Sequence, residues 1–190
     1  MATSPSHTLG QFIGDRLEES LYEPLSVVST DFQLYLDYKH ARTARSGKRK
    51  VAWKDGLENI HDLDYVLEAE GTDAVYGSPK AFIESAWRRY TKHSRNKAQE
   101  IQGAIIPLAE KYHESSPFLG VVLGGEFTQG ALDQFASHGF SVLHCPYETM
   151  MSAFDMAGLD LRTQENSPTE ELAQKAQQCQ DLGPEKLSLI

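Results

Sequence analysis

Two acidic residues, Asp64 and Glu84, lie in apolar segments that are typical of strands. Side chains alternate along residues 63–70 (LDYVLEAE), and in KAFIESAW the alternation places Glu84 on one face with Phe82. An antiparallel pairing of these strands brings both carboxylates onto one sheet face, one side-chain distance apart. Closeness and burial both make a carboxylate harder to ionise, and a divalent cation relieves both. The pair therefore predicts a Mg²⁺ (or Mn²⁺) site that activates water against a phosphodiester.

Spacing alone does not decide the point, because two unrelated strand-edge carboxylates explain it more simply. The surroundings favour the site. Five of the 18 Lys and Arg residues lie between Arg88 and Lys97, a stretch without any acidic residue, and seven more lie between Lys39 and Lys54. Basic side chains interleaved with aromatic ones suit a nucleic-acid backbone, although a solvated surface is the simpler alternative. We predict DNA contacts from two groups, Arg88, Arg89, Lys92 and Arg95 after the second strand, and Arg45, Lys48, Arg49 and Lys50 before the first.

The overall charge of -9 counts against a nucleic-acid partner only at first sight, because the positive charge is gathered in the middle of the chain and both ends are acidic. With 190 residues and 40% hydrophobic content, the chain is long enough for one domain with a core. No apolar run reaches the ~20 residues of a membrane helix, and no signal peptide is evident. Cys145 and Cys179 lie in unlike surroundings, so we expect no disulfide and a cytoplasmic location.

Hydrophobic spacing and turn residues predict the order of elements. In order, they are a helix over 9–21 capped by Thr8, a helix over 24–38, a basic loop or arm over 39–50, a short strand in VAWKDG, and strands over 63–70 and 80–87. A helix from Ser94 follows, in which we expect Ala98, Ile101, Ile105 and Leu108 to be buried and Pro107 to end or kink the helix. The last elements are a strand over 118–127, a helix over 128–139 capped by Thr128, a strand over 140–147 and a helix over 148–158.

A hairpin that leads into a strand–helix–strand unit predicts an α/β fold, with a mixed central sheet and helices on its faces. We expect one domain over residues 1–160, made of N-terminal helices over 9–38, the arm over 39–50 and a core over 60–158. Residues 161–190 are expected to form a polar, acidic tail.

The runs HDLDYVLE, FIESAWRRYTKHSRNKAQEIQGAI and FTQGALDQFASHGFSVLHCPYE resemble a bacterial family of the restriction-endonuclease-like, or PD-(D/E)XK, superfamily. The resemblance covers roughly residues 9–160. It implies an αβββαβ core, with Asp64 as the first motif acid and Glu84 as the second. It also implies metal-dependent nuclease activity, with Asp64, Glu84 and the backbone carbonyl of Ser85 as ligands.

This sequence departs from the superfamily pattern at Ala86, where the motif has lysine, and at Leu63, where it has proline. The motif lysine orients or activates the attacking water, which alanine cannot do. We expect Lys97 to replace it, with Lys92 as the alternative, and Glu100 and Gln102 on the following helix to complete the site. Glu18 or Glu19 could approach the metal, although a solvated helix face explains them more simply. Asp62 is the alternative metal ligand.

The sequence therefore predicts a Mg²⁺-dependent endonuclease of double-stranded DNA, in restriction or another defence role, with Asp64, Glu84 and Lys97 catalytic. A homodimer is expected, because cutting both strands needs two sites. The alternative is a nuclease fold that has lost catalysis and binds DNA within a larger complex, which Ala86 favours. A second alternative, a small-molecule Rossmann-like enzyme built around Gly124 and Gly125, fits the hairpin order and the basic centre less well.

Overall fold

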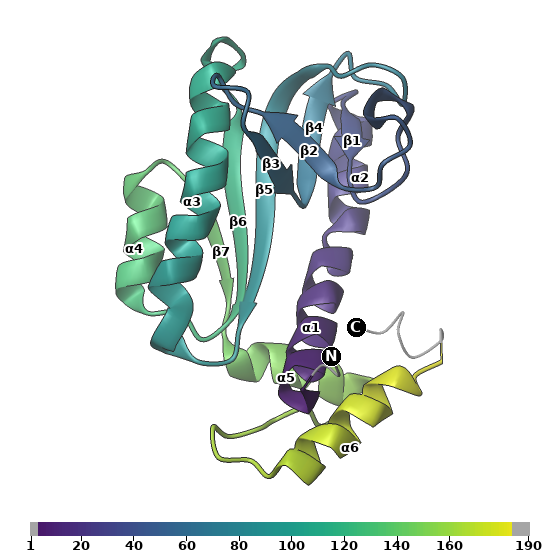
Figure 1. The fold of residues 1–190 in the computed structure, drawn as a ribbon, viewed down its shortest axis with the longest axis vertical. Helices are drawn as coiled ribbons and strands as arrows, with labels where there is room; N and C mark the ends of the chain where they lie inside the picture. The colour runs from purple at the N-terminus through teal and green to yellow at the C-terminus, as the bar shows by residue number, and fades with distance from the viewer. Residues whose placement is uncertain (1–3, 184–190) are drawn as a thin grey trace.

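A five-stranded mixed sheet forms the centre of the protein in this computed structural model, which describes residues 4–183, the side chain of His93 excepted (Figure 1). The strands lie in the order β1-β4-β5-β6-β7. Neighbours among β1, β4 and β5 are antiparallel, whereas β6 runs parallel to both β5 and β7. The prediction of an α/β fold with a mixed sheet is confirmed. The strand bounds are β1 (Tyr35–Asp37), β4 (Tyr65–Ala69), β5 (Ser78–Arg88), β6 (Phe118–Gly125) and β7 (Ser141–Cys145).

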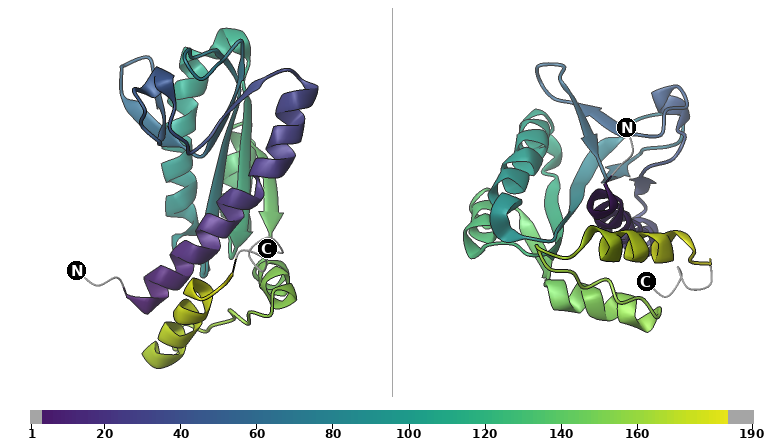
Figure 2. Two further views of the ribbon diagram at one scale, coloured as in Figure 1. Left: turned by 90° about the vertical axis from the view of Figure 1, so that its right-hand side faces the viewer. Right: turned by 60° about the horizontal axis from the view of Figure 1, so that its bottom comes forward.

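Helices cover both faces of this sheet, and a small antiparallel hairpin covers its upper part (Figures 1 and 2). One face carries α3 (Ser94–Lys111) and α4 (Gln129–Ser137). The other carries α1 (Pro5–Ser20) and α5 (Tyr147–Met156), and α6 (Thr169–Gln180) packs beside α1. The remaining elements are α2 (Tyr22–Asp31), the hairpin strands β2 (Val51–Lys54) and β3 (Ile60–Leu63), and the 3-10 turns η1 (Thr43–Arg45), η2 (Thr91–His93) and η3 (His113–Ser115).

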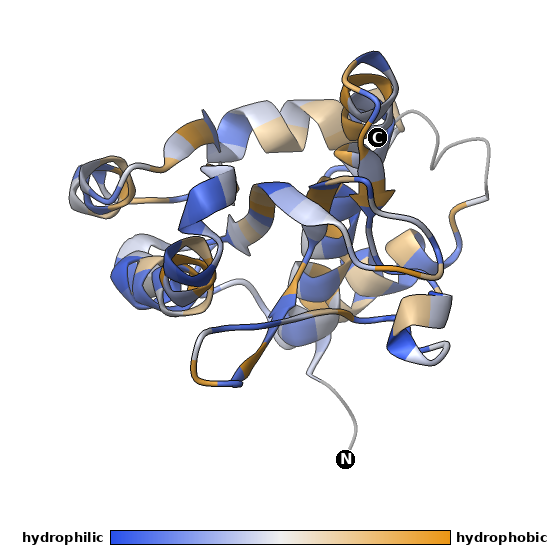
Figure 3. Ribbon diagram, turned by 90° about the horizontal axis from the view of Figure 1, so that it is seen from above, coloured by the Kyte–Doolittle hydropathy of each residue, from blue (hydrophilic) through white to orange (hydrophobic). Residues whose placement is uncertain are grey.

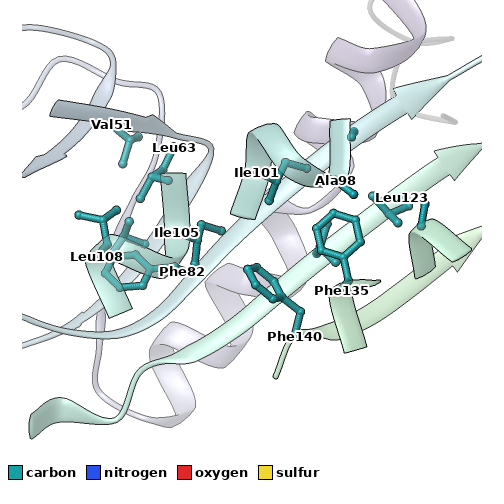
Figure 4. Close-up of a cluster of buried hydrophobic side chains, with 14 of the residues drawn as sticks. Val51, Leu63, Phe82, Ala98, Ile101, Ile105, Leu108, Leu123, Phe135 and Phe140 are labelled. Atoms are coloured by element: carbon teal, nitrogen blue, oxygen red, sulfur yellow. The ribbon is translucent and has the colours of Figure 1, made fainter. Parts of the chain in front are cut away.

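The larger core cluster fills the space between the sheet and α3 (Figure 4). The buried stripe predicted for this helix is confirmed, because its four members are all buried. These residues contact Phe82 and Leu123 from the sheet, Phe135 from α4 and Val51 from the hairpin. The helices contain both apolar and polar residues, as expected for helices that are buried on one side only (Figure 3). Pro107 neither ends α3 nor stands outside it, since the helix continues to Lys111.

The second cluster packs α1, α5 and α6 on the opposite face, and it corrects the expected tail. Leu161, in the segment before α6, and Cys179 of α6 are buried in this cluster with Ile13 of α1. Residues 161–183 therefore extend the packed unit instead of forming a tail, and residues 184–190 lie outside the described part of the chain. Cys145 and Cys179 are both free, as predicted.

Two predicted helix boundaries are wrong. The first helix begins at Pro5, where the Ser4 hydroxyl accepts a hydrogen bond from the amide of His7, so Ser4 and not Thr8 is the cap. The predicted helix over 24–38 ends at Asp31, because the chain reverses through Gln33 at a positive φ of 56°. Its last part forms β1, whose apolar residues pack on the edge of the sheet.

The segment 39–50 is not a free arm, because two of its arginines are buried in an ionic network. Arg42 donates to both carboxylate oxygens of Glu68, at 2.6 and 3.0 Å, and lies 2.8 Å from the Asp37 carboxylate. Arg45 also binds Asp37, at 2.5 Å. The rings of Tyr35 and Tyr76 lie 4.5 and 4.6 Å from the Arg42 guanidinium. This network fixes the loop against β1 and β4.

Replacing Arg42 tests how far the fold depends on this network. We expect Arg42→Ala to lower the free energy of unfolding by about 3–5 kcal/mol, because Glu68 would stay buried without its partner. Lys48→Ala, in the same loop but exposed, should change it by less than about 0.5 kcal/mol. Chemical denaturation of both variants measures the difference, and equal losses would contradict the assigned role.

Candidate functional site

The two predicted acids face one another across β4 and β5, as the sequence pattern indicated. Asp64 lies directly before β4, and the register that pairs Tyr65 with Ile83 places it opposite Glu84. The Asp64 amide donates to Glu84 Oε1 at 3.0 Å. The amide and hydroxyl of Ser85 both donate to Asp64 Oδ2, at 2.7 and 2.8 Å. These bonds hold both carboxylates in place from their backbone side.

Burial sets the charge state of the pair. Glu84 is 8% exposed, and burial, followed by the neighbouring Asp64 carboxylate, raises its pKa well above the usual 4.5. The Asp64 amide and the Lys97 ammonium act in the opposite direction on this pKa. Burial and then Asp64 also raise the pKa of Glu18. Burial and the neighbouring carboxylate thus disfavour the charged forms of Glu84 and Glu18, a cost that a nearby cation would relieve.

An open strand edge places Asp64 in the lining of a cleft, with Glu84 buried behind it. β5 continues to Arg88, whereas β4 begins opposite Ile83, so the last residues of β5 have no β4 neighbour. A cavity of about 850 Å³ lies along this edge, which we call the edge cleft. Its lining includes His7, Gln11 and Glu18 from α1, Asp64, and Ser85, Ala86, Arg88, Arg89 and Lys97 from β5 and beyond.

The helix α1 supplies the polar wall of the edge cleft. Its apolar residues Leu9, Ile13 and Leu17 are buried, so the polar stripe that contains Glu18 faces the cleft. The Tyr65 hydroxyl donates to the backbone carbonyl of Glu18 at 2.8 Å and so fixes the end of α1 against β4. Of the two glutamates considered, Glu18 lies at the site. Glu19 does not line the cleft, is mostly exposed and pairs with Arg16.

Several features of the pair fit a hard divalent cation. Asp64 Oδ1 and Glu84 Oε2 accept no hydrogen bond from any residue in the described part of the chain. Because the Ser85 amide points toward Asp64, its carbonyl points to the same side of the strand, as predicted for a ligand. Within residues 4–183, however, no three His, Cys, Asp or Glu side chains gather at metal-binding range. A bound ion would therefore depend on water or a phosphate for its remaining ligands.

Lys97, the residue predicted to replace the motif lysine, lines the edge cleft together with Asp64. It is in the first turn of α3 and its side chain is 18% exposed. Its ammonium acts to lower the pKa of Glu84, against the larger effect of burial. Glu100 pairs with Lys97 at 2.7 Å and is otherwise exposed, so its contact with the site is indirect.

Two predicted phosphate contacts, Arg88 and Arg89, line the edge cleft. Nε of Arg88 and Nη2 of Arg89 are buried and have no hydrogen-bond partner among the described residues. No described acid forms an ion pair with either arginine. The backbone of Arg88 passes close to Gly125, whose φ is +92°. A Cβ at Gly125 would lie 2.1 Å from the Arg88 carbonyl oxygen, so only glycine fits there. Gly125 therefore serves this turn at the end of β6.

The other predicted DNA contacts lie at the surface, except for Arg45, for which the prediction is wrong because its side chain is buried. Lys92 and Arg95 are exposed near the start of α3, and Lys48, Arg49 and Lys50 are exposed on the loop before β2. Arg45 is corrected, because it is 6% exposed and its guanidinium is bound to Asp37. Sequence reasoning missed this ionic network. A signal for it was present, because its acids, Asp37 of β1 and Glu68 of β4, lie in apolar segments.

Two further expectations change. Gln102 is buried between α3 and α4. Its Nε2 donates to the backbone carbonyl of Gln134 at 2.9 Å, and its Oε1 accepts from Nε2 of the Gln134 side chain at 2.7 Å. It joins two helices and is not part of the edge cleft. Asp62, the alternative ligand, is half exposed and pairs with Lys50 at 2.5 Å.

Comparison with known proteins adds no functional information. Neither protein-family models nor curated proteins gave a match. Among solved structures, the chain is similar to the crystal structure of a protein of unknown function, AF1548, with a TM-score of 0.41 and 10% identity over 95% of this chain and 92% of that chain. A similarity this weak supports no conclusion about the function of either protein. Across residues 4–183, no helix has the length and apolarity needed to span a membrane.

The raised pKa of Glu84 predicts how the free energy of unfolding changes with pH. Because it is raised in the folded chain, its proton contributes stability at low pH that is lost as pH rises from about 4.5 through the folded value. We expect Glu84→Gln, measured without divalent metal, to be more stable than wild type at pH 8 by on the order of 1–2 kcal/mol. This advantage should shrink toward pH 4.

The control for this measurement is Glu114→Gln, an exposed carboxylate for which we expect no comparable pH-dependent gain. Thermal unfolding from pH 4 to 8 distinguishes the variants. A gain for Glu84→Gln that stays constant with pH would contradict a buried, proton-binding carboxylate.

Proposed function

We propose that this protein is a metal-dependent endonuclease of double-stranded DNA, of the PD-(D/E)XK type, acting in restriction or another defence role. The observation that carries this proposal is the pairing of Asp64 with the buried Glu84 at an open strand edge, beside a cleft that is lined by Asp64 and by the basic residues Arg88 and Arg89. The order of elements in the main sheet, helix then three strands, helix and strand, supports the resemblance on which the class rests.

In this proposal Asp64, Glu84 and the Ser85 carbonyl hold Mg²⁺ or Mn²⁺. When bound, such an ion supplies activated water and stabilises charge on the phosphate. The chain's own residues position the substrate. Arg88 and Arg89, which line the cleft, bind the phosphate through their guanidinium groups, and Lys97 supplies the positive charge that Ala86 cannot. Glu18 adds negative charge on the α1 side of the cleft.

The alternative is a DNA-binding subunit of a larger complex that does not cut. Its support is Ala86, together with only two clustered acids in the described part of the chain. A cytoplasmic location and a homodimer belong to the same proposal. The two free cysteines suit a reducing compartment, and cutting both strands needs two sites.

A plasmid-nicking assay separates the two functions. With Mg²⁺ or Mn²⁺ we expect wild type to nick supercoiled DNA, and Asp64→Asn and Glu84→Gln to lose at least about 100-fold in rate, because each removes charge that holds the ion. Asp62→Asn is the matched control and should keep its activity. DNA binding by wild type without metal-dependent nicking would favour the non-cutting subunit.

Lys97 has its own test. We expect Lys97→Ala to reduce the nicking rate by about 10- to 100-fold with little change in DNA affinity, because a preorganised charge near the reacting phosphate acts mainly in the transition state. Lys92→Ala, an exposed neighbour, should instead weaken binding slightly at an unchanged rate. Equal effects of the two variants would remove Lys97 from the catalytic group.

A further inference from the structure

A second hollow lies between the loop over 39–50 and the β2–β3 hairpin, and neither Asp64 nor Glu84 lines it. It has a volume of about 790 Å³, and we call it the hairpin groove. Its lining holds five basic residues, of which Lys50 pairs with Asp62, and Lys54 and Lys111 pair with Glu58, so Lys48 and Arg49 supply its unpaired positive charge. Neither Lys48 nor Arg49 forms an ion pair with a residue in the range 4–183. The groove therefore suits an anion.

Aromatic rings line this groove beside the positive charges. Tyr76 is 38% exposed, and its orientation is fixed by the Arg42 guanidinium at 4.6 Å and by a 3.3 Å hydrogen bond from its hydroxyl to the Ala52 carbonyl. Trp53 and Tyr76 pack edge to face, with 5.1 Å between ring centroids. Trp53 is 3% exposed and its Nε1 is buried, so Tyr76 is the ring that presents surface to the groove. A fixed and partly exposed ring suits a flat ligand such as a nucleobase.

The hairpin groove is close to the carboxylate pair along the chain and in space. Ile60 and Asp62 of β3 line it, and they precede Asp64 by four and two residues, or roughly 13 and 7 Å along a strand. On the surface, Arg49 lines both this groove and a neighbouring hollow. That hollow shares Asp15 and Glu18 with the edge cleft. At about 3.4 Å per nucleotide along a duplex strand, the groove lies roughly four nucleotides from the acids.

We propose that the hairpin groove binds an unpaired stretch of polynucleotide, with a base against Tyr76 and phosphates on Lys48 and Arg49. The inference rests on the proposed function and sharpens its substrate class. The preferred substrate is a duplex with a single-stranded extension, whose junction lies at the edge cleft. An acidic peptide would use the positive charge alone and would leave the fixed, partly exposed tyrosine without a role.

The first experiment compares labelled duplexes with and without an eight-nucleotide extension, by fluorescence anisotropy in EDTA so that nothing is cut. We expect wild type to bind the extended duplex at least tenfold more tightly than the blunt one. Ile60→Glu places a negative charge in the groove and should abolish this preference. Leu57→Glu is the matched control, since it puts the same charge on another exposed apolar residue of the same hairpin that does not line the groove, and it should leave the preference intact.

The second experiment tests the base contact. Tyr76→Leu should reduce the affinity for the extended duplex by about 5- to 100-fold, the range expected when stacking on one base is lost, whereas Tyr76→Phe should retain it. An extension that carries 5-iodouracil should crosslink to Tyr76 or a groove neighbour on irradiation. Crosslinks that map only outside the groove would overturn the proposal.

The remaining outcomes separate this proposal from the previous one. Equal affinity for the two duplexes, or equal effects of Ile60→Glu and Leu57→Glu, overturns the groove assignment even if the protein cuts DNA. Groove-dependent binding in a protein that never nicks DNA supports the groove and counts against the endonuclease. Competition by poly-glutamate as strong as by a single-stranded oligonucleotide of equal charge would show a general anion surface and would also overturn the proposal.

Discussion

The site depends on one register, which places Asp64 opposite Glu84 where the pairing of β4 with β5 begins. A shift by one residue would turn one carboxylate to the other sheet face. The pairing is tied at both ends, by apolar packing of Val66 on Phe82 and by the hydrogen bonds around Ser85. Because β5 continues past this point, the same register leaves an open strand edge beside the acids. The location of the acids and the opening of the edge cleft thus have one cause.

Buried charges outside the site decide which basic residues stay at the surface. Arg42 and Arg45 are neutralised by Glu68 and Asp37, so the loop that contains them is held in place. The loop's outer lysines are thereby presented next to the hairpin, although they make few contacts of their own. Positive charge near residues 39–50 therefore has two roles that composition cannot separate. One part stabilises the fold, and the other is available to a ligand.

Sequence patterns predicted the features that depend on local periodicity. The alternation around Asp64 and Glu84 gave the facing pair, and the stripe that includes Ile101 and Ile105 gave the buried side of α3. What failed depended on contacts between distant segments. Arg45 resembled a surface arginine because its partner Asp37 was expected in a helix, and Gln102 resembled a site residue because its partner lies on α4. A single sequence does not show which distant residues meet.

The raised pKa of Glu84 also concerns how such a site forms. A carboxylate pair that required a metal to be tolerated would make folding depend on the supply of that metal. Here burial lets Glu84 keep a proton to higher pH than a carboxyl in water, so the proton is able to hold the place of a cation. Under the proposed function, the chain would fold first and exchange this proton for the ion afterwards, and binding of the ion would release the proton. Lowering the pH would then weaken the binding of the ion.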